Sequence, residues 1–131
     1  QLRCVYRPAN HSGRARAKMQ MPVISFVALE QGAVVGVVDC CMRTDSVYVR
    51  GLAVHPQSTR RGIARALLRA AEELAVRRGR HSVTLSTIKE TGNGKIFAKL
   101  GFAATAEAPA EEFEGADGRP VTRLDMMKNA Y

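Results

Sequence analysis

The chain of 131 residues is long enough for one domain with a real core and too short for two, so we predict a single domain over residues 1–131. Its 46% hydrophobic content is too high for a disordered chain. No stretch approaches the roughly 18–20 apolar residues of a membrane span, and no N-terminal segment reads as a secretory signal. The formal net charge of +8 favours an anionic ligand, because Arg is concentrated in residues 50–80.

The cysteine pattern bears on compartment and metal content. There are three cysteines, and two of them, Cys40 and Cys41, are neighbours. An odd count without regular spacing is typical of a reducing compartment, so we expect a cytoplasmic protein. No CxxC or HxxxH spacing gathers four ligands, and we therefore expect no metal.

The first half of the chain reads as strands. Residues 2–6, 23–29, 33–42 and 47–54 are apolar or alternating runs, separated by turns at 30–32 and 43–46. The last three runs are predicted to form an antiparallel meander. Residues 9–22 are polar and basic, with room for one short helix at most.

The spacing of the apolar residues then changes from that of a strand to that of a helix. From Ile63 the apolar residues recur on one helical stripe, and Gly79 is placed to cap the C-terminus of that helix. A short strand over 82–86 and a second helix over 93–100 follow, with Gly101 as the residue after the cap and Phe102 folding back on the last turn. Two strands flank the turn at 115–118, the second over 121–127. The pattern predicts a mixed α/β sheet with helices on its faces.

Residues 52–65 carry the clearest functional signal. A strand ends at Val54, a basic loop follows, and a helix begins at about Gly62. The start of a helix leaves N–H groups without partners and carries partial positive charge. Arg60, Arg61 and Arg65 add full charges there, which predicts a pyrophosphate site. The loop is neither GxxxxGK[ST] nor GxGxxG.

In this loop the sequence resembles the GCN5-related N-acetyltransferase (GNAT) superfamily. The family fingerprint Q/R-x-x-G-x-G/A is matched by residues 59–64, between Val54-His55-Pro56 and Ala66-Leu67-Leu68. A second signature, L-G-F, is present at residues 100–102, and the ends of the chain match more loosely. The resemblance implies the α/β (α+β) GNAT fold. That fold has a mixed, mostly antiparallel central sheet of about six to seven strands, with splayed central strands and flanking helices.

The resemblance also implies acetyl-CoA as co-substrate. Main-chain groups of the strand end would pair with the pantetheine arm, backbone N–H groups of the loop would hold the pyrophosphate, and the second helix would flank the arm. The cofactor residues implied are Leu52, Ala53, Val54, Thr59, Arg60, Arg61, Gly62, Ile63, Ala64, Arg65, Asn93, Ile96, Phe97 and Lys99. Two positions depart from the family pattern: Thr59 replaces its Gln or Arg, and Phe97 replaces a frequent general-acid Tyr.

Candidate catalytic residues come from the third and fourth strand runs. A two-residue turn at Thr44-Asp45 pairs Asp39 with Arg50 and Cys41 with Tyr48, which puts all four on one face. Tyr48 lies at a strand position where some members of the GNAT family have a catalytic Glu, so the resemblance implies that this face is the acceptor side. Arg50 would either bind a substrate carboxylate or orient Asp39, and Asp39 or Tyr48 would relay a proton through water.

These expectations combine into acetyl transfer from acetyl-CoA to an amine, either a small molecule or a peptide, by direct attack in a ternary complex. Two alternatives stay open. One is a CoA-binding protein that no longer transfers acetyl, argued from Phe97. The other is a basic nucleic-acid-binding domain, which the absence of Trp and the 5% aromatic content disfavour. We expect no membrane partner, and a homodimer is common in the family.

Overall fold

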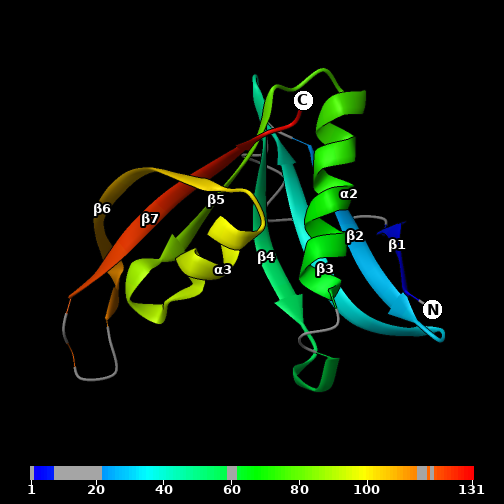
Figure 1. Cartoon of the computed structure of the whole chain (residues 1–131), viewed down its shortest axis with the longest axis horizontal. Helices are drawn as coiled ribbons and strands as arrows, with labels where there is room; N and C mark the ends of the chain where they lie inside the picture. The colour runs from blue at the N-terminus through cyan, green and yellow to red at the C-terminus, as the bar shows by residue number, and fades with distance from the viewer. Residues whose placement is uncertain (1, 8–21, 59–61, 115–117, 119) are drawn as a thin grey trace. The chain divides into compact units, whose positions relative to one another are not determined.

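The computed structural model describes residues 2–7, 22–58, 62–114, 118 and 120–131. Within these ranges the chain forms seven strands and two α-helices (Figure 1). It divides into two compact units, residues 1–83 with 130–131, and residues 84–129. The mixed α and β composition predicted from the sequence is confirmed. The single-domain prediction and the splay of the central strands stay predictions.

The first unit contains four antiparallel neighbours in the order β1-β2-β3-β4. These strands are β1 (Leu2–Arg7), β2 (Val23–Glu30), β3 (Ala33–Met42) and β4 (Ser46–Val54). Gln31 and Gly32 join β2 to β3 with φ of 53° and 84°, as a two-residue hairpin turn requires. The four predicted strands are confirmed, each to within a residue at either end. The short helix allowed over 9–22 falls almost wholly outside the described residues.

Strand β4 contains a bulge at Gly51. Asp39 pairs with Arg50, whereas Val37 pairs with Ala53, so the pairing shifts by one residue between them. Gly51 has φ of 65°, a conformation that costs glycine little. The bulge separates the part of β4 that carries Tyr48 and Arg50 from the part that ends at Val54.

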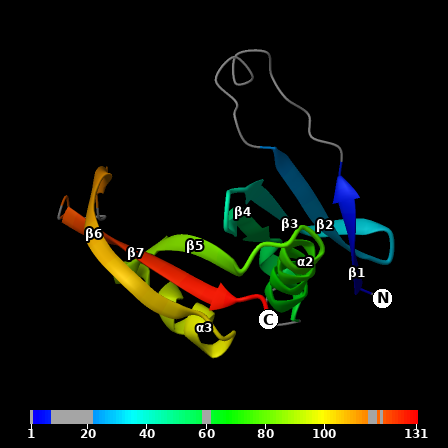
Figure 2. The same cartoon turned by 90° about the horizontal axis from the view of Figure 1, so that it is seen from above.

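Helix α2 (Ile63–Arg77) packs on one face of this sheet (Figure 2). Six of its residues are buried, at the helical spacing expected from the sequence: Ile63, Leu67, Leu68, Ala71, Leu74 and Ala75. Helix α2 lies very close to strand β3 at Gly36. A Cβ at Gly36 would lie 2.8 Å from Ile63 Cγ2 and 3.0 Å from Leu67 Cδ1. Glycine at position 36 therefore lets the helix reach the sheet.

The C-terminus of α2 is capped as predicted. Gly79 has φ of 70°. Its N–H donates to the Val76 carbonyl at 3.2 Å, and the Arg80 N–H donates to the Ala75 carbonyl at 2.8 Å. This pair of bonds is the Schellman motif.

The second unit holds most of β5 (Ser82–Ile88), then α3 (Asn93–Lys99), β6 (Ala103–Glu114) and β7 (Pro120–Asn129). Its strands follow the order β5-β7-β6, with β6 and β7 antiparallel. Helix α3 also ends in a Schellman motif, because Phe102 N–H donates to the Phe97 carbonyl at 3.0 Å and Gly101 N–H to Ala98 at 3.1 Å. The Phe97 and Phe102 rings meet edge to face, with centroids 6.1 Å apart. The fold-back predicted for Phe102 is confirmed.

No helix in the described ranges is long and apolar enough to cross a membrane.

Candidate functional site

The predicted register of the β3–β4 hairpin is confirmed. Asp39 is the Cα partner of Arg50, and Cys41 is the partner of Tyr48. Residues two apart on a strand point to the same face, so these four side chains share the face opposite α2. We call this the polar face. Arg50 is exposed, while Asp39 and Tyr48 are half-buried.

The sequence reasoning missed Ser25 on strand β2. Ser25 is the Cα partner of Asp39 on the side away from Arg50. Its hydroxyl donates to Asp39 Oδ1 at 2.6 Å, and the residue is only 4% exposed. A polar residue among Val23, Phe26 and Val27 in an otherwise apolar strand is the signal that would have identified it. The bond fixes the orientation of the Asp39 carboxylate from the β2 side.

Arg43 was also missed. Its guanidinium carbon lies 4.1 Å from the centroid of the Tyr48 ring, which is a cation–π contact. The Arg43 carbonyl accepts a hydrogen bond from Arg80 Nε at 2.7 Å, which ties the β3–β4 turn to the segment after α2. The contact places a second positive charge at the end of the polar face.

The two thiols on β3 have different surroundings. Cys40 lies on the α2 side, fully buried, and burial raises its pKa to about 12. Burial also raises the pKa of Cys41, although the charges of Arg50 and Arg43 act in the opposite direction. Because the thiolate is the nucleophilic form, neither residue is suited to attack a thioester. Among the described residues, no three His, Cys, Asp or Glu side chains gather as a metal site.

The segment after β4 turns the chain toward α2. His55 N–H donates to the Val35 carbonyl at 2.8 Å, and Gln57 N–H donates to His55 Nδ1 at 3.1 Å. His55 thus stabilises the short helix η1 (Pro56–Ser58). Thr59, Arg60 and Arg61, three of the predicted cofactor residues, lie outside the described residues.

The start of α2 has the features expected of an anion site. Gly62 is the N-cap, with φ of 78° and no side-chain capping bond. Ala66 N–H makes the first bond, to the Gly62 carbonyl at 3.0 Å, so the N–H groups of residues 63–65 precede the intrahelical ladder. The first turn contains no acidic residue, and Arg65 is exposed there. Ile63 is 1% exposed, so its side chain belongs to the core beneath the helix and is not presented to a ligand.

The strand end predicted to meet the pantetheine arm follows the bulge. Ala53 pairs with Val37 and Val54 with Gly36, while Leu52 lies in the bulged stretch. A bulge interrupts the regular ladder and redirects backbone groups. The arrangement agrees with a cofactor-binding segment, but the role of Leu52, Ala53 and Val54 stays a prediction.

The remaining predicted cofactor residues belong to the second unit. Asn93 begins α3, and its N–H donates to Thr91 Oγ1 at 3.2 Å. Ile96 is 55% exposed and Lys99 is exposed. Phe97 packs on Phe102 and has no hydroxyl to donate a proton. Since the two units are described separately, the contribution of α3 to a joint cofactor site stays a prediction.

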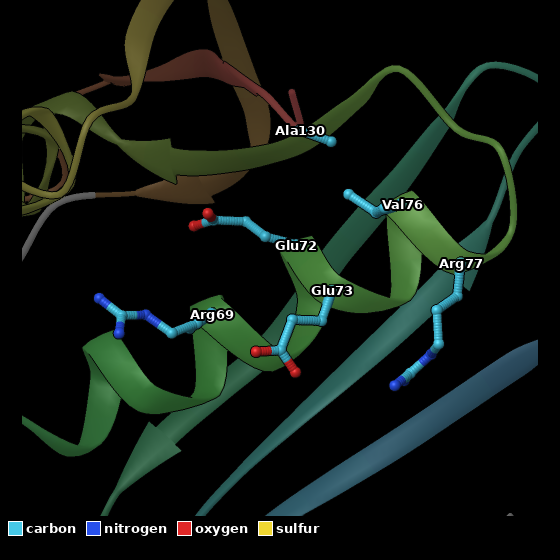
Figure 3. A pocket seen from close by; sticks show the side chains of 6 residues that line it. All are labelled: Arg69, Glu72, Glu73, Val76, Arg77 and Ala130. Carbon is cyan, nitrogen blue, oxygen red and sulfur yellow. The ribbon is translucent and has the colours of Figure 1, made fainter.

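A hollow of about 380 Å³ lies on the exposed side of α2. Figure 3 shows five of its lining side chains on the helix, with Ala130 beside Val76. None of the predicted site residues lines it. The residues are Arg69, Glu72, Glu73, Val76, Arg77 and Ala130.

Comparison with known proteins establishes the family. The model of the acetyltransferase (GNAT) family matches residues 3–102, well over half of the chain. The protein therefore belongs to the GNAT family. The match runs from the first strand through the α2 start to the L-G-F motif. No match was found among the curated proteins.

Solved structures confirm the GNAT fold. An IAA acetyltransferase from Bacillus cereus ATCC 14579 aligns with a TM-score of 0.77 at 18% identity, over 98% of this chain and 99% of that one. Nourseothricin acetyltransferase aligns with a TM-score of 0.74 at 22% identity, over 83% of this chain and 66% of that one. An aminoglycoside 6'-N-acetyltransferase complexed with coenzyme A aligns with a TM-score of 0.68 at 16% identity, over 83% of this chain and 73% of that one.

Proposed function

We propose that the protein transfers an acetyl group from acetyl-CoA to the nitrogen of an amine. The observation that carries this proposal is the family match over residues 3–102, which includes the loop and helix start predicted to bind pyrophosphate. The uncapped, acid-free first turn of α2 supports it, since anions bind at such helix starts. The coenzyme A complex of the aminoglycoside acetyltransferase supports the choice of cofactor.

The reaction would be a direct displacement. The neutral amine nitrogen attacks the thioester carbonyl carbon, a C–N bond forms, and the C–S bond breaks as CoA leaves as a thiolate. The amine gives up one proton and the thiolate takes one. Holding both substrates together supplies much of the rate, and backbone donors at Leu52, Ala53 and Val54 would polarise the carbonyl oxygen.

Proton transfer would fall to the polar face. Asp39, oriented by Ser25, or Tyr48 would accept the amine proton through water. Phe97 cannot protonate the departing thiolate, but a thiol with a pKa near 8.5 is a tolerable leaving group without a dedicated acid. Water would then supply that proton.

Calorimetric titration with acetyl-CoA, CoA and ATP tests the cofactor site. The chain offers a matched pair of variants, because Gly62 and Gly79 both have positive φ and open space around a Cβ, at opposite ends of α2. We expect Gly62→Glu to abolish acetyl-CoA binding and Gly79→Glu to retain it, with folding of both checked by circular dichroism. Equal affinities in the two variants, or no CoA binding by the wild type, would refute the site.

A second candidate function is CoA binding without transfer. Phe97 favours it, because this position in the family frequently holds a general-acid Tyr. Mass spectrometry after incubation with acetyl-CoA and a pool of amines separates the two functions. Acetylated product supports the transferase, and binding without product supports the alternative.

A further inference from the structure

The polar face carries one row of side chains across three strands. Ser25, Asp39 and Arg50 are successive Cα partners on β2, β3 and β4. Two roles were open for Arg50, namely orienting Asp39 or binding a carboxylate of the acceptor. The 2.6 Å bond from Ser25 orients the Asp39 carboxylate from the opposite side. Ser25 can therefore orient Asp39 without Arg50.

The charges described on this face are unbalanced. Its described charged side chains are Asp39, Arg43 and Arg50, so positive charge exceeds negative by one. Arg43 is placed over the Tyr48 ring. Burial raises the pKa of the Cys41 thiol, and the positive charges of Arg50 and Arg43 both act against this rise, so both charges reach this part of the face. An acceptor with a single anionic group would balance this excess of one positive charge.

The spacing of the row limits the size of that acceptor. Directly opposed residues of an antiparallel pair have Cα atoms only about 4.5–5.5 Å apart. An ammonium facing Asp39 and an anion facing Arg50 would then lie a few bonds apart within one molecule. The planar guanidinium matches the two coplanar oxygens of a carboxylate.

We propose that the acceptor is an amine that carries a carboxylate within a few bonds, as in an α- or β-amino acid, and that Arg50 binds this carboxylate while Asp39 faces the amine. The inference rests on the proposed acetyl transfer. Arg50 is a specificity residue in this scheme, and Ser25 is a positioning residue for Asp39.

Matched pairs of acceptors test it. Each pair is an amino acid and the same amine without its carboxylate: β-alanine with ethylamine, and phenylalanine with phenethylamine. Acetyl transfer to each is measured by mass spectrometry. 2-Aminoethylphosphonate is added to distinguish a carboxylate from a phosphonate. We expect the carboxylated member to have at least about tenfold higher kcat/KM, since hydrogen bonds to charged groups discriminate at this level. Arg50→Gln should remove the preference by raising KM for the carboxylated member of each pair.

Arg69→Gln is the control, because it removes the same charge from the exposed side of α2. It should leave the preference intact. Three results would overturn the inference without affecting the proposed acetyl transfer: equal kcat/KM for both members of a pair, a higher kcat/KM for the phosphonate, or a carboxylate preference that Arg50→Gln retains. Acetyl-CoA binding without acetylation of any carboxylated amine would overturn it as well. If the wild-type protein did not bind acetyl-CoA at all, the proposed function itself would be refuted.

Discussion

Helices α2 and α3 have similar ends and different middles. Each follows a glycine with positive φ that provides no side-chain cap, Gly62 for α2 and Gly92 for α3. Each ends in a Schellman motif at another such glycine, Gly79 or Gly101. However, α2 buries six side chains, whereas the seven residues of α3 bury none.

The difference shows that the two helices are held by different forces. Isolated helices shorter than about 12–15 residues are marginal in water, so α3 depends on its ends. Thr91 Oγ1 accepts the Asn93 N–H, and Lys128 Nζ donates to the Leu100 carbonyl at 3.0 Å. Helix α2 is held by packing on the sheet, which fixes the position of its N-terminus, the predicted anion site. We therefore expect core changes to affect α2 and cap changes to affect α3.

The largest effect is expected for Leu67→Ala. Leu67 is fully buried between α2 and the sheet, so truncation leaves a cavity and should cost about 2–5 kcal/mol of unfolding free energy. Urea denaturation measures the loss. Val76→Ala on the same helix is the control, since Val76 is 43% exposed and should change the free energy by less than about 1 kcal/mol. Equal losses would contradict the packing account of α2.

Gly101→Ala should come next. Alanine at φ of 100° is strained, and its Cβ would meet Lys128 Cε at 2.9 Å, so we expect a loss of about 1–2 kcal/mol. Hydrogen exchange should show the α3 amides opening first. Gly79→Ala applies similar strain to α2, whose amides should stay protected because packing holds them. Loss of protection throughout α2 would argue that its cap, not its core, holds it.

Sequence alone predicted the β3–β4 register, since a two-residue turn determines every pair up to the next irregularity. It could not predict that Ser25 faces Asp39. Continuing the β2–β3 hairpin from its turn would set Ile24 opposite Asp39, but a shift between Ala28 and Leu29 brings Ser25 there instead. The Gly51 bulge moves the partner of Val37 in the same way, from Leu52 to Ala53. Bulges depend on long-range packing, and the place of Ser25 beside the predicted Asp39–Arg50 pair therefore emerged only from the structure.

The exposed side chain of Ile96 on α3 offers a smaller test. Ile96 is 55% exposed, so Ile96→Ala should change the unfolding free energy by less than about 0.5 kcal/mol. If Ile96 covers the pantetheine arm, as proposed, the variant should weaken acetyl-CoA binding about two- to fivefold, because partial burial of an aliphatic side chain contributes about 0.5–1 kcal/mol. Calorimetry measures the affinity. An unchanged Kd would remove Ile96 from the proposed cofactor site.

The smallest effect concerns pH and the segment leading into α3. Glu90, in the short helix η2 (Lys89–Thr91), accepts the Thr122 N–H at 2.8 Å, and the Thr122 hydroxyl donates to its other oxygen at 2.9 Å. The backbone bond from Thr122 is the main cause that holds the Glu90 pKa below its ordinary value of 4.5. A carboxyl with a lowered pKa in the folded state stabilises that state above its unfolded pKa, and the stabilisation is lost as pH falls through the folded value.

Acidification below about pH 4.5 should therefore loosen the start of α3 before α2, with hydrogen exchange at the Thr122 and Asn93 amides as the readout. Glu90→Gln should remove this pH dependence, because the amide does not titrate yet keeps an acceptor oxygen. Glu107→Gln is the control, since it removes a carboxylate that pairs with the neighbouring Lys89 at 3.0 Å but has no bond to Thr122. The opposite result would be that Glu107→Gln removes the pH dependence of hydrogen exchange while Glu90→Gln keeps it. The ion pair between Lys89 and Glu107 would then be the acid-sensitive contact, and α3 would depend on surface charge more than on its caps.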